Sequence, residues 1–261
     1  MRILFIFFLV CFSIFRSSAE RTRIELKYGS DQRNRLIVSA PTETNDNPVV
    51  IWFHGGGLTG GEPYIPDEFL DTEYIVVAPG YRLLPGVDID TCIGDAADAV
   101  AWVWNNINDL GGDKSKIFIA GHSAGGYLTS MLGLDKSRLA AVGLDADSIA
   151  GLFPLSGQAI THYEWRKLNG GSELQPTVDN HAPLYHVRKD APPYIIICGD
   201  RNLEMFGRYE ENAYMWRMMK LIGHPDVEIY EIGGHNHGDM VSPALHIMKQ
   251  HIKRLQSQLS K

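Results

Sequence analysis

A strand that breaks abruptly into a glycine-rich turn is the feature that most constrains this fold. The apolar residues 117–120 run directly into Gly121-His-Ser-Ala-Gly125, and a helix-compatible segment follows from Tyr127. Flanking glycines let the backbone fold tightly enough to hold a strained serine with its hydroxyl above a sheet. The pattern G-x-S-x-G in this context predicts that Ser123 is a nucleophile, whereas a chance Gly-Ser turn is the alternative.

A second glycine cluster, His54-Gly-Gly-Gly57, follows the apolar residues 49–53. A bulky side chain there would prevent the backbone from turning and approaching a ligand closely. The backbone N–H groups of Gly56 and Gly57, with that of Ala124, are therefore candidates for an oxyanion hole. One such donor contributes about 3 kcal/mol to the stability of a transition state. A plain Gly-rich turn is the other interpretation.

Apolar segments alternate with helical segments along the rest of the chain. The expected strands are residues 23–28, 35–39, 49–53, 74–78, 117–120, 149–155, 194–198 and 227–232. The expected helices are residues 94–110, 127–132, 207–223 and 245–259. Strands that are apolar throughout and alternate with helices indicate a parallel sheet covered on both faces, here preceded by an antiparallel hairpin. A polar insertion separates the sixth and seventh strands at about residues 158–190.

Composition is that of an ordinary globular protein. The 261 residues include 44% hydrophobic and 21% charged residues, which excludes disordered, coiled-coil and collagen-like classes. The net charge of −7 argues against a nucleic-acid partner.

The first nineteen residues are typical of a cleavable signal peptide. Arg2 precedes an apolar run over residues 3–15, and Ser17, Ser18 and Ala19 are small residues where a signal peptidase cleaves. A membrane anchor is the alternative, but the run is shorter than the roughly 20 residues that span a bilayer. We therefore expect a signal over residues 1–19, one α/β domain over residues 20–261, and a secreted or periplasmic protein without a stable membrane anchor.

Three cysteines occur, and Cys11 would leave with the signal. Cys92 and Cys198 could pair in an oxidising compartment or stay as separate core thiols. The sequence leaves both possibilities open.

A nucleophilic serine needs a base, and the base needs an acid, in the chain order Ser, Asp or Glu, His. The base should follow the last strand, where His237 directly precedes a glycine and the final helix, so we assign it to His237. His235 is the runner-up. A metal site made by the pair is a weaker idea because no third ligand is evident nearby.

The acid should follow the strand before, in the segment Gly199-Asp-Arg-Asn-Leu-Glu204. Asn202 stands where many such loops carry the acid, and an amide cannot supply the negative charge that stabilises an imidazolium. Asp200 is preferred because it lies at the end of the strand, with Glu204 as the alternative. The non-catalytic alternative is that Asp200 forms a local salt bridge with Arg201 or Arg208.

Three motifs together resemble the α/β-hydrolase esterases related to hormone-sensitive lipase and the bacterial feruloyl and acetyl esterases. They are His54-Gly-Gly-Gly57, Tyr81-Arg-Leu-Leu-Pro85 and Gly121-His-Ser-Ala-Gly-Gly126. The resemblance implies an α/β-hydrolase fold with an eight-stranded, mostly parallel sheet, and a serine carboxylesterase that uses no metal or cofactor. It also implies short-chain or aryl esters as substrates, with plant-polysaccharide esters as a plausible target.

The resemblance departs from the family pattern at two places. The N-terminal cap helices of lipase-like members are absent, which predicts an open site partly roofed by residues 158–190 in place of a large cap. The acid loop carries Asn202. Within the insertion, His162, Tyr163 and Trp165 could line an aromatic pocket or pack the insertion against the core.

Three functions are compatible with these residues. The first is a secreted esterase that forms an acyl-enzyme on Ser123 with a small-molecule or carbohydrate ester. The second is an amidase, formamidase or peptidase, since amide cleavage needs the same groups. The third is a binding protein that has lost catalysis, which the intact Ser123, His237 and glycine loop disfavour. The natural substrate and the oligomeric state cannot be read from the sequence.

Overall fold

The computed structural model describes residues 20–43 and 45–259, so the predicted signal segment with its Cys11 lies outside the described residues. The described part contains one sheet of eight strands in the order β1-β2-β4-β3-β5-β6-β7-β8. The strands are β1 Arg21–Lys27, β2 Arg35–Pro41, β3 Asn47–Phe53, β4 Ile75–Pro79, β5 Gly112–His122, β6 Gly151–Leu155, β7 Tyr194–Gly199 and β8 Val227–Ile232.

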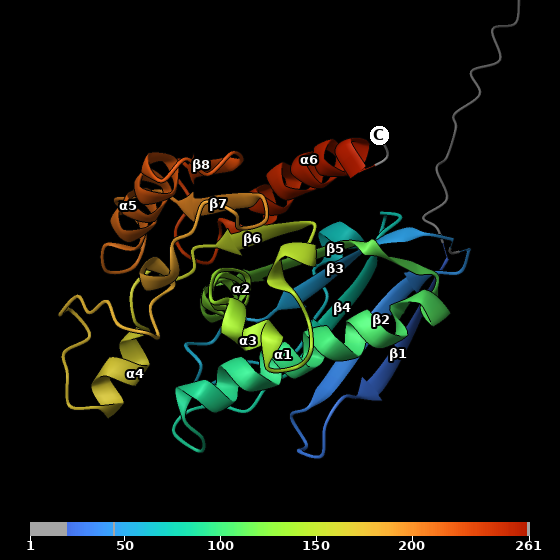
Figure 1. The fold of residues 1–261 in the computed structure, drawn as a ribbon, viewed down its shortest axis with the longest axis horizontal. Helices are drawn as coiled ribbons and strands as arrows, with labels where there is room; N and C mark the ends of the chain where they lie inside the picture. The colour runs from blue at the N-terminus through green and yellow to red at the C-terminus, as the bar shows by residue number, and fades with distance from the viewer. Residues whose placement is uncertain (1–19, 44, 260–261) are drawn as a thin grey trace, which may run out of the picture.

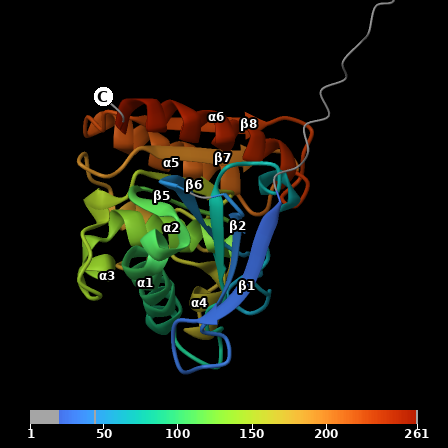
Figure 2. The same cartoon turned by 90° about the vertical axis from the view of Figure 1, so that its right-hand side faces the viewer.

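The sheet is mostly parallel, as the sequence predicts. β1 pairs antiparallel with β2, with Arg23 opposite Ser39, and β2 pairs antiparallel with β4. Every other neighbouring pair is parallel. The predicted hairpin therefore forms one edge of the sheet and β8 the other (Figure 1), and the view in Figure 2 looks onto the hairpin edge.

Helices fill the crossovers between the parallel strands. They are α1 Ile89–Asn106, α2 Ala124–Leu134, α3 Lys136–Ala140, α4 Tyr163–Leu168, α5 Arg208–Leu221 and α6 Val241–Leu259, with short 3-10 turns η1 Asp67–Phe69, η2 Ile107–Leu110, η3 Ala146–Ser148 and η4 Pro183–His186. α1 begins before the expected residue 94. The Asp88 carboxylate accepts a hydrogen bond of 2.7 Å from the N–H of Thr91, which caps the helix at that point.

The two faces of the sheet carry separate apolar cores. Residues of α1, α2 and α5 pack on one face, and residues of α6 and η1 pack on the other. Within β3 the neighbours Ile51 and Trp52 point to opposite faces, and both side chains are fully buried. Burial on both faces explains why this strand is apolar at consecutive positions instead of alternating.

The predicted small insertion lies between β6 and β7. It contains α4, which projects from the body of the molecule, and η4 (Figure 1). Cys92 on α1 and Cys198 on β7 are both buried and unpaired, so the structure shows two separate core thiols. Among the described residues, none of the helices combines the length and apolar character needed to cross a membrane.

Candidate active site

The turn between β5 and α2 holds Ser123 in a strained conformation. Its φ of 56° and ψ of −117° lie in a region that a non-glycine residue rarely adopts, and such strain is often found at functional sites. The Ser123 N–H bonds the carbonyl of Leu155 at 2.8 Å. A Cβ atom on Gly125 would lie 2.0 Å from the carbonyl oxygen of Phe53, so only glycine permits this close approach.

The loop after β8 brings His237 to the serine. Its Nε2 lies 2.9 Å from Ser123 Oγ, although the two residues are 114 positions apart in the chain. The structure therefore places together the two residues predicted as nucleophile and base. His235, the runner-up, instead directs its Nδ1 to the carbonyl of Gly233 at 3.1 Å.

Glu204, and not Asp200, contacts the imidazole of His237. His237 Nδ1 lies 2.8 Å from Glu204 Oε2. The preference for Asp200 as the acid is therefore wrong in this structure, and the alternative Glu204 takes the position. The reason is local geometry. The N–H of Glu204 bonds the carbonyl of Asp200 at 2.9 Å, so one helical turn after β7 folds Glu204 back beneath the base.

The Glu204 carboxylate is buried and fully hydrogen-bonded. Its Oε1 accepts from the Ser156 hydroxyl and from the N–H of Gly199 at 3.0 Å. Its Oε2 accepts from the N–H of Met205 at 3.1 Å as well as from His237. Burial raises the pKa of Glu204, but the bonds from His237 and Ser156 outweigh it and hold the pKa at about 2. The side chain is thus an anion at neutral pH.

Ser156 was not predicted from the sequence. It is fully buried at the end of β6 with a φ of 44°, and its carbonyl accepts a hydrogen bond from Arg208. Arg208 in turn donates to Glu211 at 2.9 Å. The position directly after an apolar strand is the only signal in the sequence for Ser156, and it does not distinguish a functional residue from a turn residue.

Asp200 binds the backbone of the loop after β8, residues 233–239, which we call the base loop, and does not contact the imidazole ring of His237. Its carboxylate accepts from the N–H of Gly234 at 2.8 Å and from the N–H of Asn202 at 2.9 Å. Its own N–H donates to the carbonyl of His235 at 2.8 Å. The hydrogen bonds from Gly234 and Asn202 lower the pKa of Asp200. The suggested salt bridge with Arg201 or Arg208 does not form, because Arg201 pairs with Glu231 and Arg208 pairs with Glu211.

The predicted oxyanion loop lies beside the elbow. A Cβ atom on Gly55 would be 3.3 Å from the Cβ of Ser123. Gly56 and Gly57 both adopt positive φ angles, 112° and 64°. The Ala124 N–H is the first of α2, and the first N–H groups of a helix have no partner within it. The glycine loop therefore passes beside the nucleophile at Gly55, and Ala124 directly follows Ser123 at the start of α2.

The motif at residues 81–85 packs against the glycine loop at residues 54–57. The buried Tyr81 ring stacks on His54 with centroids 4.4 Å apart, and its hydroxyl donates to the His54 carbonyl at 2.8 Å. Arg82 binds the buried Asp95 of α1 through its backbone and its guanidinium at 2.6 to 2.9 Å. These contacts fix the start of the loop that carries Gly56.

The insertion reaches over the glycine loop through Tyr163. A Cβ atom on Gly57 would lie 2.7 Å from the Tyr163 hydroxyl oxygen. His162 is buried and stacks on Tyr163, with centroids 4.9 Å apart. Trp165 packs edge-on against His181 within the insertion. Of the three aromatic candidates, Tyr163 is therefore the one at the edge of the site.

A pocket of about 380 Å³ lies between the insertion, including Tyr163, and the start of α5. Its walls mix apolar and polar side chains from the insertion and from the start of α5, including Ile160, Leu174, Phe206, Arg166 and Glu210. A larger hollow of about 570 Å³ lies between β1, η1 and α6. Neither Ser123, Glu204 nor His237 lines it.

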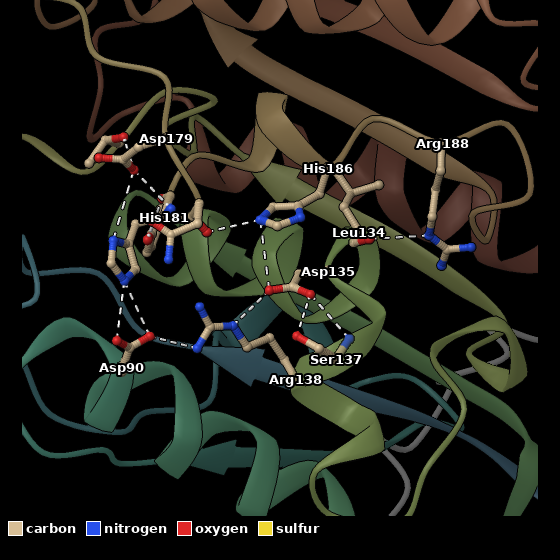
Figure 3. A network of polar contacts seen from close by, with 12 residues as sticks. Asp90, Leu134, Asp135, Ser137, Arg138, Asp179, His181, His186 and Arg188 are labelled. Carbon is tan, nitrogen blue, oxygen red and sulfur yellow. Dashed lines mark hydrogen bonds and ion pairs between the residues drawn. The ribbon is translucent and has the colours of Figure 1, made fainter.

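A polar network ties the insertion to α1 and α3 (Figure 3). His181 Nε2 lies 3.2 Å from both oxygens of Asp90, and Arg138 donates to Asp90 at 2.7 Å. Arg138 also binds Asp135, which lies 3.7 Å from His186 of η4. The C-terminal part of the insertion is thus attached to α1 and α3 by polar contacts.

Metal-binding groups are not assembled at the site. Within residues 20–43 and 45–259, no three or more His, Cys, Asp or Glu side chains are grouped so that they could hold an ion. His237, the member of the histidine pair that enters the site, is held between Ser123 and Glu204.

Comparisons with known proteins identify a family, relatives and a similar fold. The BD-FAE family model matches residues 37–204, more than half of the chain. The sequence is 31% identical over 160 residues to a probable isoprenylcysteine alpha-carbonyl methylesterase of Arabidopsis thaliana. The aligned segment covers 58% of this chain and 37% of that protein. It is 25% identical over 248 residues to esterase LipC of Mycobacterium tuberculosis, which covers 83% of this chain and 59% of that protein.

The solved structures extend the similarity to the whole described domain. A truncated form of a carbohydrate esterase from gut microbiota superposes with a TM-score of 0.77 at 14% identity, covering 92% of this chain and 97% of that one. At this identity the match establishes the α/β-hydrolase fold. The chain spans less than two thirds of the length of the two sequence relatives.

Proposed function

Because the chain belongs to the BD-FAE family and aligns Ser123, His237 and Glu204 through two hydrogen bonds, we propose that it is a serine carboxylesterase. The row of hydrogen bonds from Glu204 to Ser123 is the observation that carries this proposal. It meets the geometric requirement of a nucleophile within reach of a base that is itself oriented by a third group.

The acylation step follows from this geometry. Ser123 Oγ attacks the ester carbonyl carbon while its proton moves to His237 Nε2. The ionised Glu204 stabilises the imidazolium that results. Collapse of the tetrahedral intermediate breaks the bond to the alcohol, which leaves with the proton from His237, and the acyl group stays on Ser123.

Deacylation repeats the sequence with water. The N–H groups of Gly56, Gly57 and Ala124 are the proposed donors to the oxyanion in both steps, and fixed donors of this kind need no reorganisation during the reaction. His237 takes a proton from water, the hydroxide attacks the acyl carbonyl, and Ser123 recovers its proton as the acid leaves.

The proposed substrates are short-chain or aryl esters, with acylated plant polysaccharides as their source. The pocket beside Tyr163 supports this class because Phe206 and Leu174 offer apolar surface while Arg166 and Glu210 offer polar groups. The structural similarity to a protein described as a carbohydrate esterase points in the same direction.

We also propose that residues 1–19 are removed on export and that the mature protein is secreted or periplasmic. The basis is the sequence pattern alone. N-terminal sequencing of protein recovered from a periplasmic or culture fraction tests it. Glu20 as the first residue is the expected result.

Hydrolysis of p-nitrophenyl acetate, butyrate and octanoate by the mature protein tests the activity. We expect turnover of the short esters that disappears in Ser123→Ala, and covalent labelling of the wild type alone by a fluorophosphonate. Matched anilides distinguish an esterase from an amidase. Absence of ester turnover and of labelling by the wild type would remove the esterase proposal.

A further inference from the structure

The side chain directly before the nucleophile holds the main chain of the base. His122 is the last residue of β5, and its Nε2 lies 2.7 Å from the carbonyl oxygen of His237, 115 positions away in the chain. The two rings are also in contact, with centroids 4.6 Å apart and planes inclined at 43°. A residue inside the elbow motif therefore touches the base as well as preceding the serine.

The direction of this hydrogen bond fixes the tautomer of His122. A carbonyl oxygen only accepts, so Nε2 must carry the proton and donate it. In a neutral ring Nδ1 is then unprotonated. Burial, and then the charge of His237, lower the pKa of His122 to about 4. His122 is accordingly a neutral N–H donor at the pH where an ester hydrolase of this type works.

The base loop needs such a contact. Residues 233–239 include three glycines, which leave the loop backbone conformationally free. Asp200 holds the beginning of the loop at Gly234 and His235, and the Asn236 side chain accepts from the N–H groups of residues 238 and 239 at 2.9 and 3.0 Å. These anchors lie on either side of His237 and leave its carbonyl to His122.

We propose that His122 is a positioning residue for the esterase reaction, which fixes His237 through a hydrogen bond to the main-chain carbonyl. This inference rests on the proposed function. Glu204 sets the rotation of the His237 ring, and His122 sets the position from which that ring projects. Because His122 and Ser123 are adjacent on the end of one strand, the same rigid element positions both nucleophile and base.

A small displacement is enough to matter. Ser123 Oγ and His237 Nε2 are 2.9 Å apart, near the middle of the hydrogen-bonding range. A misplacement of about 1 Å in a catalytic group costs about 100-fold in rate. Loss of the His122 contact is therefore expected to lower kcat with little effect on KM, because no bound part of the substrate is altered.

Three substitutions separate the hydrogen bond from the shape of the ring. His122→Gln places an amide N–H near the position of Nε2, whereas His122→Asn places it near Nδ1 and out of reach of the carbonyl. His122→Phe keeps a ring of similar shape without a donor. Circular dichroism and thermal unfolding verify that each variant is folded before kcat, KM and the pH profile of kcat/KM are measured with p-nitrophenyl acetate.

We expect kcat to fall about 10- to 100-fold in His122→Asn and His122→Phe, and to stay within about threefold of wild type in His122→Gln. If His122→Phe fails to fold, the Gln and Asn pair decides. Equal activity in these two variants, or wild-type kcat in His122→Phe, would overturn the proposal.

A spectroscopic readout keeps the test independent of turnover. The proton between His237 Nδ1 and Glu204 gives a downfield ¹H NMR signal when the ring is fixed. We expect it in the wild type and His122→Gln, and a broadened or absent signal in His122→Asn. Should the wild type prove inactive on every ester, the proposed function fails, while an unchanged signal in all the variants separately refutes the role of His122.

Discussion

Replacing Glu204 by Gln tests the assignment of the acid. Gln keeps the size of the side chain and removes its charge. Both carboxylate oxygens accept hydrogen bonds, Oε1 from Ser156 and Gly199, and Oε2 from His237 and Met205. An amide must place its NH₂ group on one side or the other. Either orientation sets a donor against a backbone N–H, and one of them also removes the acceptor for His237.

The structure gives a scale for the loss. The pKa of Glu204 is about 2 compared with an ordinary value of 4.5. Since one pKa unit corresponds to 1.36 kcal/mol, the folded site favours the ionised carboxylate by about 3 kcal/mol, or roughly 300-fold in an equilibrium constant. An acid-to-amide change in a Ser-His-Asp triad lowers kcat about 10⁴-fold. We expect kcat of Glu204→Gln to fall between these two limits, about 10²- to 10⁴-fold.

Asp200→Asn is the matched control, because it makes the same chemical change in the same loop. Asp200 contacts the base loop through Gly234 but does not reach the ring of His237. We expect its kcat on p-nitrophenyl acetate to stay within about tenfold of wild type, because Asp200 acts on His237 only through the backbone of the loop and not on its ring. A collapse of activity in Asp200→Asn with near-normal activity in Glu204→Gln would refute the assignment made from the structure.

Two further predictions concern acid stability and the oxyanion loop. The pKa of Glu204 is lowered on folding, so its contribution to the free energy of unfolding is fully present above about pH 4.5 and is lost as the pH falls toward 2. Urea unfolding at pH 6, 4 and 3 should show this loss in the wild type and a flatter dependence in Glu204→Gln, and equal slopes would contradict it. Gly57→Ala should lower kcat at least about tenfold, because its Cβ would lie 2.7 Å from the Tyr163 hydroxyl and its φ is 64°. Removing the obstacle with Tyr163→Ala should restore part of the rate, and no recovery in the double variant would assign the whole effect to backbone strain.

The elements that the sequence predicts best are those with a strong local pattern. All eight expected strands form. In the central strands an apolar run that is buried on both faces marks the strand, whereas the edge strand β1 is mostly exposed and is marked by β-branched and apolar residues that alternate with polar ones. The strained conformation of Ser123 follows from glycines whose added Cβ atoms would collide with the backbone. The predicted start of helix α1 at residue 94 lies too far along the chain. The helix begins at Ile89 because Asp88 caps it, and the apolar periodicity does not reveal this cap.

The acid could not be chosen from the sequence because the choice depends on the path of a short turn. Asp200 and Glu204 lie in the same loop and carry the same charge. A spacing of four residues corresponds to about one helical turn, but the sequence does not show whether the loop makes that turn. The two acids could therefore face the same side of the loop or opposite sides. The buried hydroxyl of Ser156 decides the matter by providing a donor at the inner position, and nothing near Ser156 in the sequence indicates that role.

Asp200 and Glu204 are alternatives for one role on sequence grounds, yet the structure gives each of them a separate role on the base loop. Glu204 points inward and holds the ring of His237, whereas Asp200 points outward and holds the backbone at Gly234. His122 completes the arrangement from the side of the nucleophile. A glycine-rich loop that must present one imidazole to one hydroxyl needs restraint of both ring and main chain, because a ring held only at Nδ1 can still pivot about that bond. Substituting Asp200 should therefore act on the position of the base, as substituting His122 should, and the two changes together should lower kcat by less than the product of their separate effects if they restrain the same motion.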